Sequence, residues 1–254
     1  MVATLPVEGR EQVLRHLQRY PIPGSFLCVY METSGFSATS ATVVDHSVAL
    51  VQLGGATPVI RNLARGMLRW NFSNTPAPIL ERLHNDLDRL RMAEPAQGTG
   101  QYPEYGSAVQ HSAIDGREAV ATMAASIADA ILAGTPVVGH GLLSFHWNFL
   151  KPHLPVTVDE QLDSSMLLGG VVDTSHIEKL RQADEGVYAM SSVPLAEWQR
   201  NAAAIRSKSK WSLRSFMLPL YGLGVPPGTV LTADDMLIRY CEILQEWYKL
   251  GSGT

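Results

Sequence analysis

Three strand-like segments follow one another near the start of the chain, with only turn-forming residues between them. Residues 25–31 read SFLCVYM, a short continuous apolar run that is typical of a strand buried on both faces. Residues 42–53 (TVVDHSVALVQL) and 57–63 (TPVIRNL) also have strand composition, and Gly54-Gly55 between them indicates a hairpin turn. Strands joined by such short connections pair antiparallel, because a parallel pair needs a crossover of roughly a dozen residues or more. The sequence therefore predicts a three-strand antiparallel meander.

The rest of the chain alternates helical and strand patterns. Helical periodicity covers residues 8–20, 76–93, 116–133, 194–220 and 232–250, and a further helix begins near 145. Strand patterns occur at 135–141 and within 157–169, and residues 95–110 have loop composition. This order is typical of a mixed α/β sheet with helices on both faces. We expect one domain over residues 1–254, with an N-terminal helical extension at 1–24 and a flexible tail at 251–254.

Composition limits the classes of partner. The formal net charge of −4 means that the molecule as a whole does not attract a polyanion, so nucleic-acid binding requires a local basic patch. Cys28 and Cys241 stand in apolar contexts, which predicts buried thiols in a reducing compartment. No apolar run approaches the roughly 18 residues of a membrane span. We expect a cytoplasmic protein without a membrane partner.

An acidic residue stands at the end of the first predicted strand. Residues 29–36 read VYMETSGF, in which Glu32 follows the apolar run and a turn at Gly35 comes next. Paired carboxylates at such a strand end hold divalent cations. The residue two positions before Glu32, where a second carboxylate could stand on the same face of the strand, is Tyr30. A neutral phenol is a poor ligand for Mg²⁺. The alternative is a buried strand end in which residues 33–35 form a turn.

Two later segments also carry polar side chains. Residues 137–150 (VVGHGLLSFHWNFL) place His146 at the start of a helix, either as a ligand for a transition metal or as a packing residue beside Trp147. Residues 228–240 (GTVLTADDMLIRY) open the last helix with Asp235, three positions after Thr232. That spacing is also close to a helix capping box, which needs no metal.

Together, and in this order, the three segments resemble the DnaQ-like 3′–5′ exonucleases of the DEDD superfamily over residues 25–250. In that family they read apolar-Asp-x-Glu-Thr-x-Gly, then Gly-His-Asn-x-x-x-Phe-Asp-x-x-Phe-Leu, then His-x-Ala-x-x-Asp. The second segment matches at Gly139, His140, Phe145, Phe149 and Leu150, with Gly141 in place of the Asn. Asp163 in QLDSS falls where the family often has Asp-Thr. The resemblance implies a ribonuclease-H-like fold and an ancestral two-metal hydrolysis.

The resemblance also implies a degraded active site. Glu32 and Asp235 occupy retained catalytic positions, whereas Tyr30 and His146 replace metal-binding aspartates and Val230 replaces the general-base histidine. Loss of the base alone costs roughly 10²–10⁴ in rate. We therefore expect a catalytically degraded protein, without a cofactor, that binds a nucleic-acid 3′ end or a protein partner.

Two other interpretations stay open at this point. The first is an active nuclease or phosphodiesterase with an altered site, in which Glu32, His146 and Asp235 hold one divalent metal ion, either Mg²⁺ or a transition metal such as Mn²⁺. The second is a structural subunit of a larger assembly. An accessory site formed by His111, Asp115 and His140 also requires the fold to bring these residues together.

One basic segment is suited to nucleic acid. Residues 206–214 (RSKSKWSLR) gather four cations around one aromatic side chain, a combination that contacts phosphates and stacks a base. The alternative is a solvated loop at a helix entry. The candidate nucleic-acid-binding residues are Arg206, Lys208, Lys210, Trp211 and Arg214, together with His140.

Overall fold

The computed structural model describes residues 14, 17, 21–33, 43–69, 114–153, 170–175, 213, 218–224 and 232–253. Its strands are β1 (Ser25–Thr33), β2 (Val43–Gln52), β3 (Val59–Arg69), β4 (Ile114–Asp115), β5 (Val137–Gly139) and β6 (Val171–Asp173). Its helices are α4 (Gly116–Leu132), η2 (Leu142–His146), α5 (Trp147–Leu150), η3 (Lys151–His153), α10 (Leu218–Leu220) and α11 (Ala233–Ser252). The predicted segments 76–93, 95–110 and 157–169 lie outside the described residues, as does most of 8–20 and 194–220.

The strands form one mixed sheet in the order β4-β3-β2-β1-β5-β6. β1 pairs antiparallel with β2, and β2 with β3, so the predicted meander is confirmed, with β3 continuing to Arg69. On its other side β1 pairs in parallel with β5, and β5 pairs in parallel with β6. β6 was not predicted as a strand. The mixed α/β class expected from the sequence is therefore what the described residues form.

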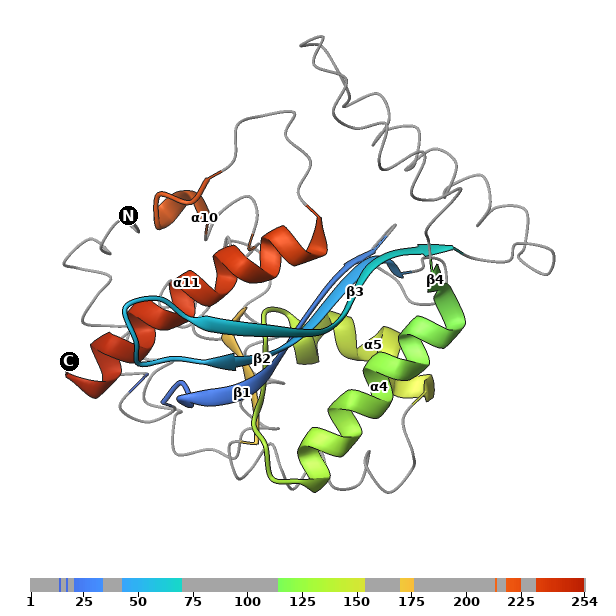
Figure 1. The fold of residues 1–254 in the computed structure, drawn as a ribbon, viewed down its shortest axis with the longest axis horizontal. Coiled ribbons are helices and arrows are strands. Elements are labelled where there is room, and N and C mark those ends of the chain that lie inside the picture. The colour runs from blue at the N-terminus through green and yellow to red at the C-terminus, as the bar shows by residue number, and fades with distance from the viewer. Residues whose placement is uncertain are drawn as a thin grey trace, which may run out of the picture.

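Helices cover both faces of this sheet (Figure 1). Alternate residues of β1 face opposite sides: Phe26, Cys28 and Tyr30 pack in the cluster that contains α11, and Leu27, Val29 and Met31 in the cluster that contains α4. A strand covered on both sides has no polar alternation, because neither face meets water. This double cover explains the continuous apolar run in SFLCVYM.

The last predicted helix, residues 232–250, is confirmed as α11. Its N-terminus is a capping box, in which Thr232 and Asp235 each bind the other's backbone N–H. The helix buries an apolar stripe against the sheet that includes Tyr240, Leu244 and Trp247. The stripe also brings Cys241 against Cys28, and both thiols are buried as expected, with burial and the neighbouring thiol raising the pKa of Cys28.

α4 confirms the helix predicted over 116–133 and covers the opposite face of the sheet. It ends near Gly134, which adopts a positive φ of 69°, and the chain then returns as β5 beside β1. The N–H of Leu27 donates to the carbonyl of Pro136 at 2.8 Å, which aligns the two parallel strands. Within the described ranges, no helix combines the length and apolar character needed to cross a membrane.

Candidate functional site

The parallel strands β5 and β6 end together at one edge of the sheet, and β1 beside them continues to Thr33. The register places Val29, Gly139 and Asp173 side by side on β1, β5 and β6. In sheets with parallel strands, ligands bind outside these carboxyl ends. Polar side chains gather there although most of them are buried. We call this group the edge site; it consists of Tyr30, Glu32, His140, His146, Asp173 and Thr174.

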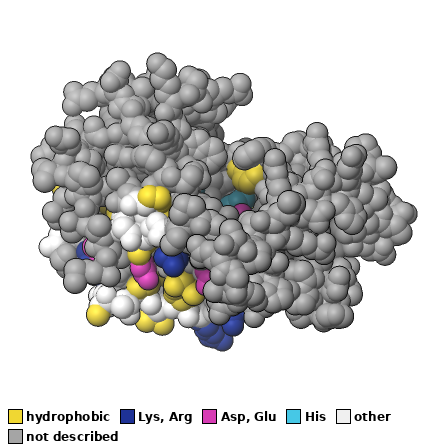
Figure 2. Space-filling model, turned by 90° about the horizontal axis from the view of Figure 1, so that it is seen from above, with side chains coloured by type: hydrophobic (Ala, Val, Ile, Leu, Met, Phe, Trp, Pro, Cys, Tyr) yellow, Lys and Arg dark blue, Asp and Glu magenta, His cyan; other side chains and the backbone are white. Residues whose placement is uncertain are grey.

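The residues of the edge site are largely buried. Tyr30, His140, His146 and Asp173 are each less than a tenth exposed, and Glu32 is half-buried. Figure 2, a view from above Figure 1, shows only a little histidine and acidic surface beside hydrophobic atoms near the centre of that face. The edge site is therefore a buried polar group with a partly accessible carboxylate.

The side chains of Tyr30 and Glu32 are hydrogen-bonded to each other. Both side chains project from β1 toward the face that α11 covers, because they are two residues apart on one strand. The Tyr30 hydroxyl donates a hydrogen bond to Oε1 of Glu32 at 3.0 Å. The phenol of Tyr30 thus contacts the Glu32 carboxylate directly.

His146 meets Tyr30 across the strands. Their ring centroids lie 5.9 Å apart in an edge-to-face arrangement. Burial lowers the pKa of His146 to about 4, an effect opposed by the Asp173 carboxylate and reinforced by His140, while the Met31 backbone raises it slightly. Its Nδ1 is buried without a hydrogen-bond partner among the described residues. The low pKa keeps His146 neutral at physiological pH, and an unsatisfied buried ring nitrogen costs about 1–3 kcal/mol.

Gly141 explains how the chain turns from β5 into the helix that carries His146. It adopts the left-handed conformation, with φ 69° and ψ 19°, and its carbonyl accepts from the N–H groups of Phe145 and His146. Its own N–H donates to Oδ1 of Asp173 at 2.8 Å. Asn and Gly are the residues that adopt this conformation most readily. Gly141 therefore suits this turn, and the Asn that stands here in the family pattern would suit it too.

Thr174 links the edge site to α11. Its Oγ1 lies 2.6 Å from the Tyr240 hydroxyl and 3.1 Å from Nδ1 of His140. Burial, followed by the nearby Cys28 thiol, raises the pKa of Tyr240 well above its ordinary value, so the phenol stays protonated. The chain His140–Thr174–Tyr240 fixes the orientation of the His140 ring, which is buried rather than presented to a nucleic-acid strand.

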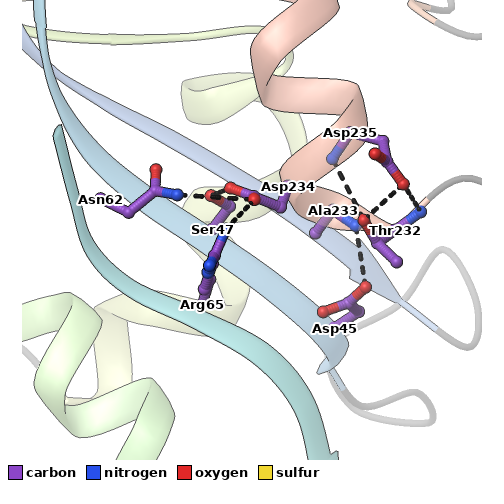
Figure 3. A network of polar contacts seen from close by, with 8 residues as sticks. All are labelled: Asp45, Ser47, Asn62, Arg65, Thr232, Ala233, Asp234 and Asp235. Carbon is purple, nitrogen blue, oxygen red and sulfur yellow. Dashed lines mark hydrogen bonds and ion pairs between the residues drawn. The ribbon is translucent and has the colours of Figure 1, made fainter. Parts of the chain in front are cut away.

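Asp235 makes the capping contacts that the sequence offered as the alternative to a metal-binding role. Its Oδ2 accepts from the hydroxyl and the N–H of Thr232, at 2.7 and 3.1 Å (Figure 3). These bonds with Thr232 are the interactions that Asp235 makes within the described part of the chain. The capping alternative raised by the sequence accounts for them fully.

Other acids near the α11 N-terminus were not singled out from the sequence. Buried Asp45 of β2 accepts from the N–H groups of His46 and Ala233, both at 2.8 Å. Asp234 accepts from Ser47 at 2.9 Å and from Arg65 at 2.5 Å (Figure 3). Carboxylates at a helix N-terminus satisfy its N–H groups and its positive dipole. These contacts fasten α11 to β2 and β3.

Among the described residues, no three His, Cys, Asp or Glu side chains are placed to hold a metal ion. Val230, Asp163, His111 and the basic residues Arg206, Lys208, Lys210, Trp211 and Arg214 lie outside the described residues, as does the side chain of Asp115. The accessory site and the basic segment therefore stay predictions.

Asp173 and Thr174 are the site residues that sequence reasoning missed. An Asp-Thr pair after an apolar strand end is the pattern that was assigned to Asp163, and the segment GGVVDTS carries it fully. The structure brings this pair to the edge site, whereas Asp163 lies outside the described residues. No protein-family profile matches the chain, and a search of curated proteins gives no match either.

Proposed function

We propose that this chain is a catalytically degraded relative of the DnaQ-like exonucleases, with a ribonuclease-H-like fold, that works by binding a nucleic-acid end or a protein partner. The supporting observation is the contact of Tyr30 with both Glu32 and His146 at the carboxyl ends of parallel strands. Positions 30, 32 and 146 come from two motifs over a hundred residues apart, and the resemblance requires them to meet. Their meeting supports the motif assignment and hence the ancestry.

The same contact supports the loss of catalysis. Two-metal hydrolysis needs carboxylates that share the cations, whereas here a phenol donates to the retained carboxylate and a neutral imidazole replaces the other acid. Asp235 is engaged with Thr232. The alternative of one metal ion on Glu32, His146 and Asp235 has less support, because no described contact joins Asp235 to the other two.

The test of this proposal is a digestion assay. The purified protein is incubated with Mg²⁺ or Mn²⁺ and 5′-labelled single- and double-stranded DNA and RNA, with Glu32→Ala as the matched control. We expect the substrates to keep their length with both proteins. Shortening from the 3′ end by wild type that Glu32→Ala abolishes would overturn the proposal in favour of an active nuclease.

A second assay separates the two kinds of partner. If the protein binds a nucleic-acid end, reversing Lys208 and Lys210 to Glu weakens binding and flattens its salt dependence, because each lost phosphate contact removes about one released counterion. Affinity and salt slope are measured with single-stranded oligonucleotides by fluorescence anisotropy. Unchanged values would assign residues 206–214 to a solvated loop and leave the protein partner as the favoured ligand.

A further inference from the structure

The hairpin end of β2 and β3 exposes apolar side chains on one face of the sheet. Leu50 is 37% exposed, Val59 63% and Leu63 47%. These are three of the five large hydrophobic residues that are exposed among the described residues. Single exposed apolar residues are ordinary, but a group of them on one face marks an interaction site.

The strand register shows that this group is continuous. Leu50 pairs with Arg61 and Gln52 with Val59, so Leu50, Arg61 and Val59 share one face. Leu63 lies next to them at the β-bulge, where the register shifts opposite Val48 and Ala49. We call Leu50, Val59, Arg61 and Leu63 the hairpin patch.

α4 covers the same face only further along the strands. Leu27, which pairs with Leu50, and Val48 both pack in the α4 cluster and are buried. In Figure 1, α4 lies across the half of the sheet near β4, and the β2–β3 turn extends away from it. The apolar face therefore continues beyond the helix that buries its other half.

Arg61 gives the hairpin patch its charge. It is exposed and has no ion pair or hydrogen bond with any other residue that the structure describes. Arg65, four positions further along β3, differs because it forms an ion pair with Asp234 of α11. Arginine is enriched in protein interfaces and among the residues that contribute most to binding. An exposed arginine among apolar side chains therefore resembles such an interface and can pair with a carboxylate of the partner.

We propose that the hairpin patch binds a segment of a partner protein that presents apolar side chains around one carboxylate. A second copy of this chain fits less well, because a two-fold interface would bring the two Arg61 side chains into the same small contact. A nucleic acid fits less well too, since its affinity comes from several cations rather than one. The patch deepens the protein-partner branch of the proposed function, and it lies at the opposite end of β1 and β2 from the edge site.

The probe is a fluorescent peptide that alternates valine with threonine and carries one central glutamate, compared with the same peptide carrying lysine. The glutamate peptide is expected to bind wild type and to bind Arg61→Glu about fivefold or more weakly, the scale of one exposed ion pair. Arg61→Glu should in turn prefer the lysine peptide. Leu63→Ser should weaken both, whereas Ile238→Ser, an exposed apolar residue of α11 on the other side of the sheet, should change neither.

Charge reversal without exchange of peptide preference would overturn the proposal, as would equal effects of Leu63→Ser and Ile238→Ser. A dimer of the wild type in sedimentation that Leu63→Ser converts to a monomer would assign the patch to a second copy instead. These readouts do not depend on the digestion assay. Nuclease activity would refute the degraded-enzyme proposal and leave the peptide result standing.

Discussion

Replacing Tyr30 and His146 together by aspartate tests whether the edge site descends from a metal centre. The double variant places carboxylates beside Glu32 and Asp173 at positions that contact each other in the wild type. Hard carboxylate oxygens are the ligands that Mg²⁺ and Mn²⁺ prefer. If the backbone keeps the ancestral geometry, the variant should bind one of these ions and the wild type should not.

The structure sets the size of the effect. Tyr30 is only 7% exposed and packs in the core against α11, so its truncation costs about 3–5 kcal/mol, as for other large buried side chains. Clustered carboxylates add repulsion, and the metal-free variant should melt well below wild type. An ion at a hundred times its Kd returns about 2.7 kcal/mol, and each kcal/mol raises Tm by about 2–4 °C in a domain of this size. The expected metal-dependent rise is therefore about 5–11 °C.

The matched control carries asparagine at both positions. Asparagine has nearly the same size as aspartate and creates the same cavity, but it lacks the charge that holds a cation. Thermal melts of both variants with and without Mn²⁺, together with calorimetric titration, separate metal binding from a general ion effect. Equal shifts in the two variants, or no binding to a folded aspartate variant, would refute the assignment of positions 30 and 146 to one metal site.

Three further changes test other parts of the structure. Asp45→Ala leaves the N–H groups of His46 and Ala233 unsatisfied and should cost about 2–5 kcal/mol in denaturant unfolding. Arg65→Ala should cost about 1 kcal/mol or less, because the Arg65 side chain in the ion pair with Asp234 is 59% exposed. Gly141→Ala should cost about 1–2 kcal/mol because of its left-handed backbone, while Gly141→Asn should be tolerated; melting curves that rank the two in the opposite order would contradict the turn geometry. Because the pKa of His146 falls from 6.5 to about 4 on folding, the unfolded chain takes up a proton first, and stability should decline as pH falls from about 6.5 to 4; a His146→Gln variant that loses stability equally over this range would exclude that histidine as the cause.

Local patterns were enough to predict the sheet meander and α11. The continuous apolar run SFLCVYM was enough to predict a strand covered on both faces. The pair Thr232 and Asp235 was enough to predict the start of α11, because a capping box involves residues only three positions apart. The same locality explains the difference at Asp235. The resemblance assigned it to a metal, but the nearby Thr232 supplies two hydrogen bonds without help from the rest of the fold.

Contacts between distant segments could not be predicted in this way. β6 is three residues long and pairs with β5. A segment of this length is too short to show the periodicity from which a strand is predicted. Asp163 and Asp173 both follow apolar residues and precede small polar ones. Asp173 reaches the edge site through the pairing of β6 with β5, which the local pattern does not contain. Cys28 and Cys241 likewise meet because α11 crosses the face of β1, a fact that neither cysteine's sequence neighbours contain.

The position of α11 has a consequence for how the protein is made. Ala233 bonds with Asp45 although 188 residues separate them, and α11 supplies much of the buried cluster on its face of the sheet. During synthesis, at roughly 5–20 residues per second, the meander of β1 to β3 emerges long before this helix. Phe26, Ala49 and Val51 therefore lack their packing contacts with α11 for at least about ten seconds after they are synthesised. During this interval exposed strand faces can associate with other chains.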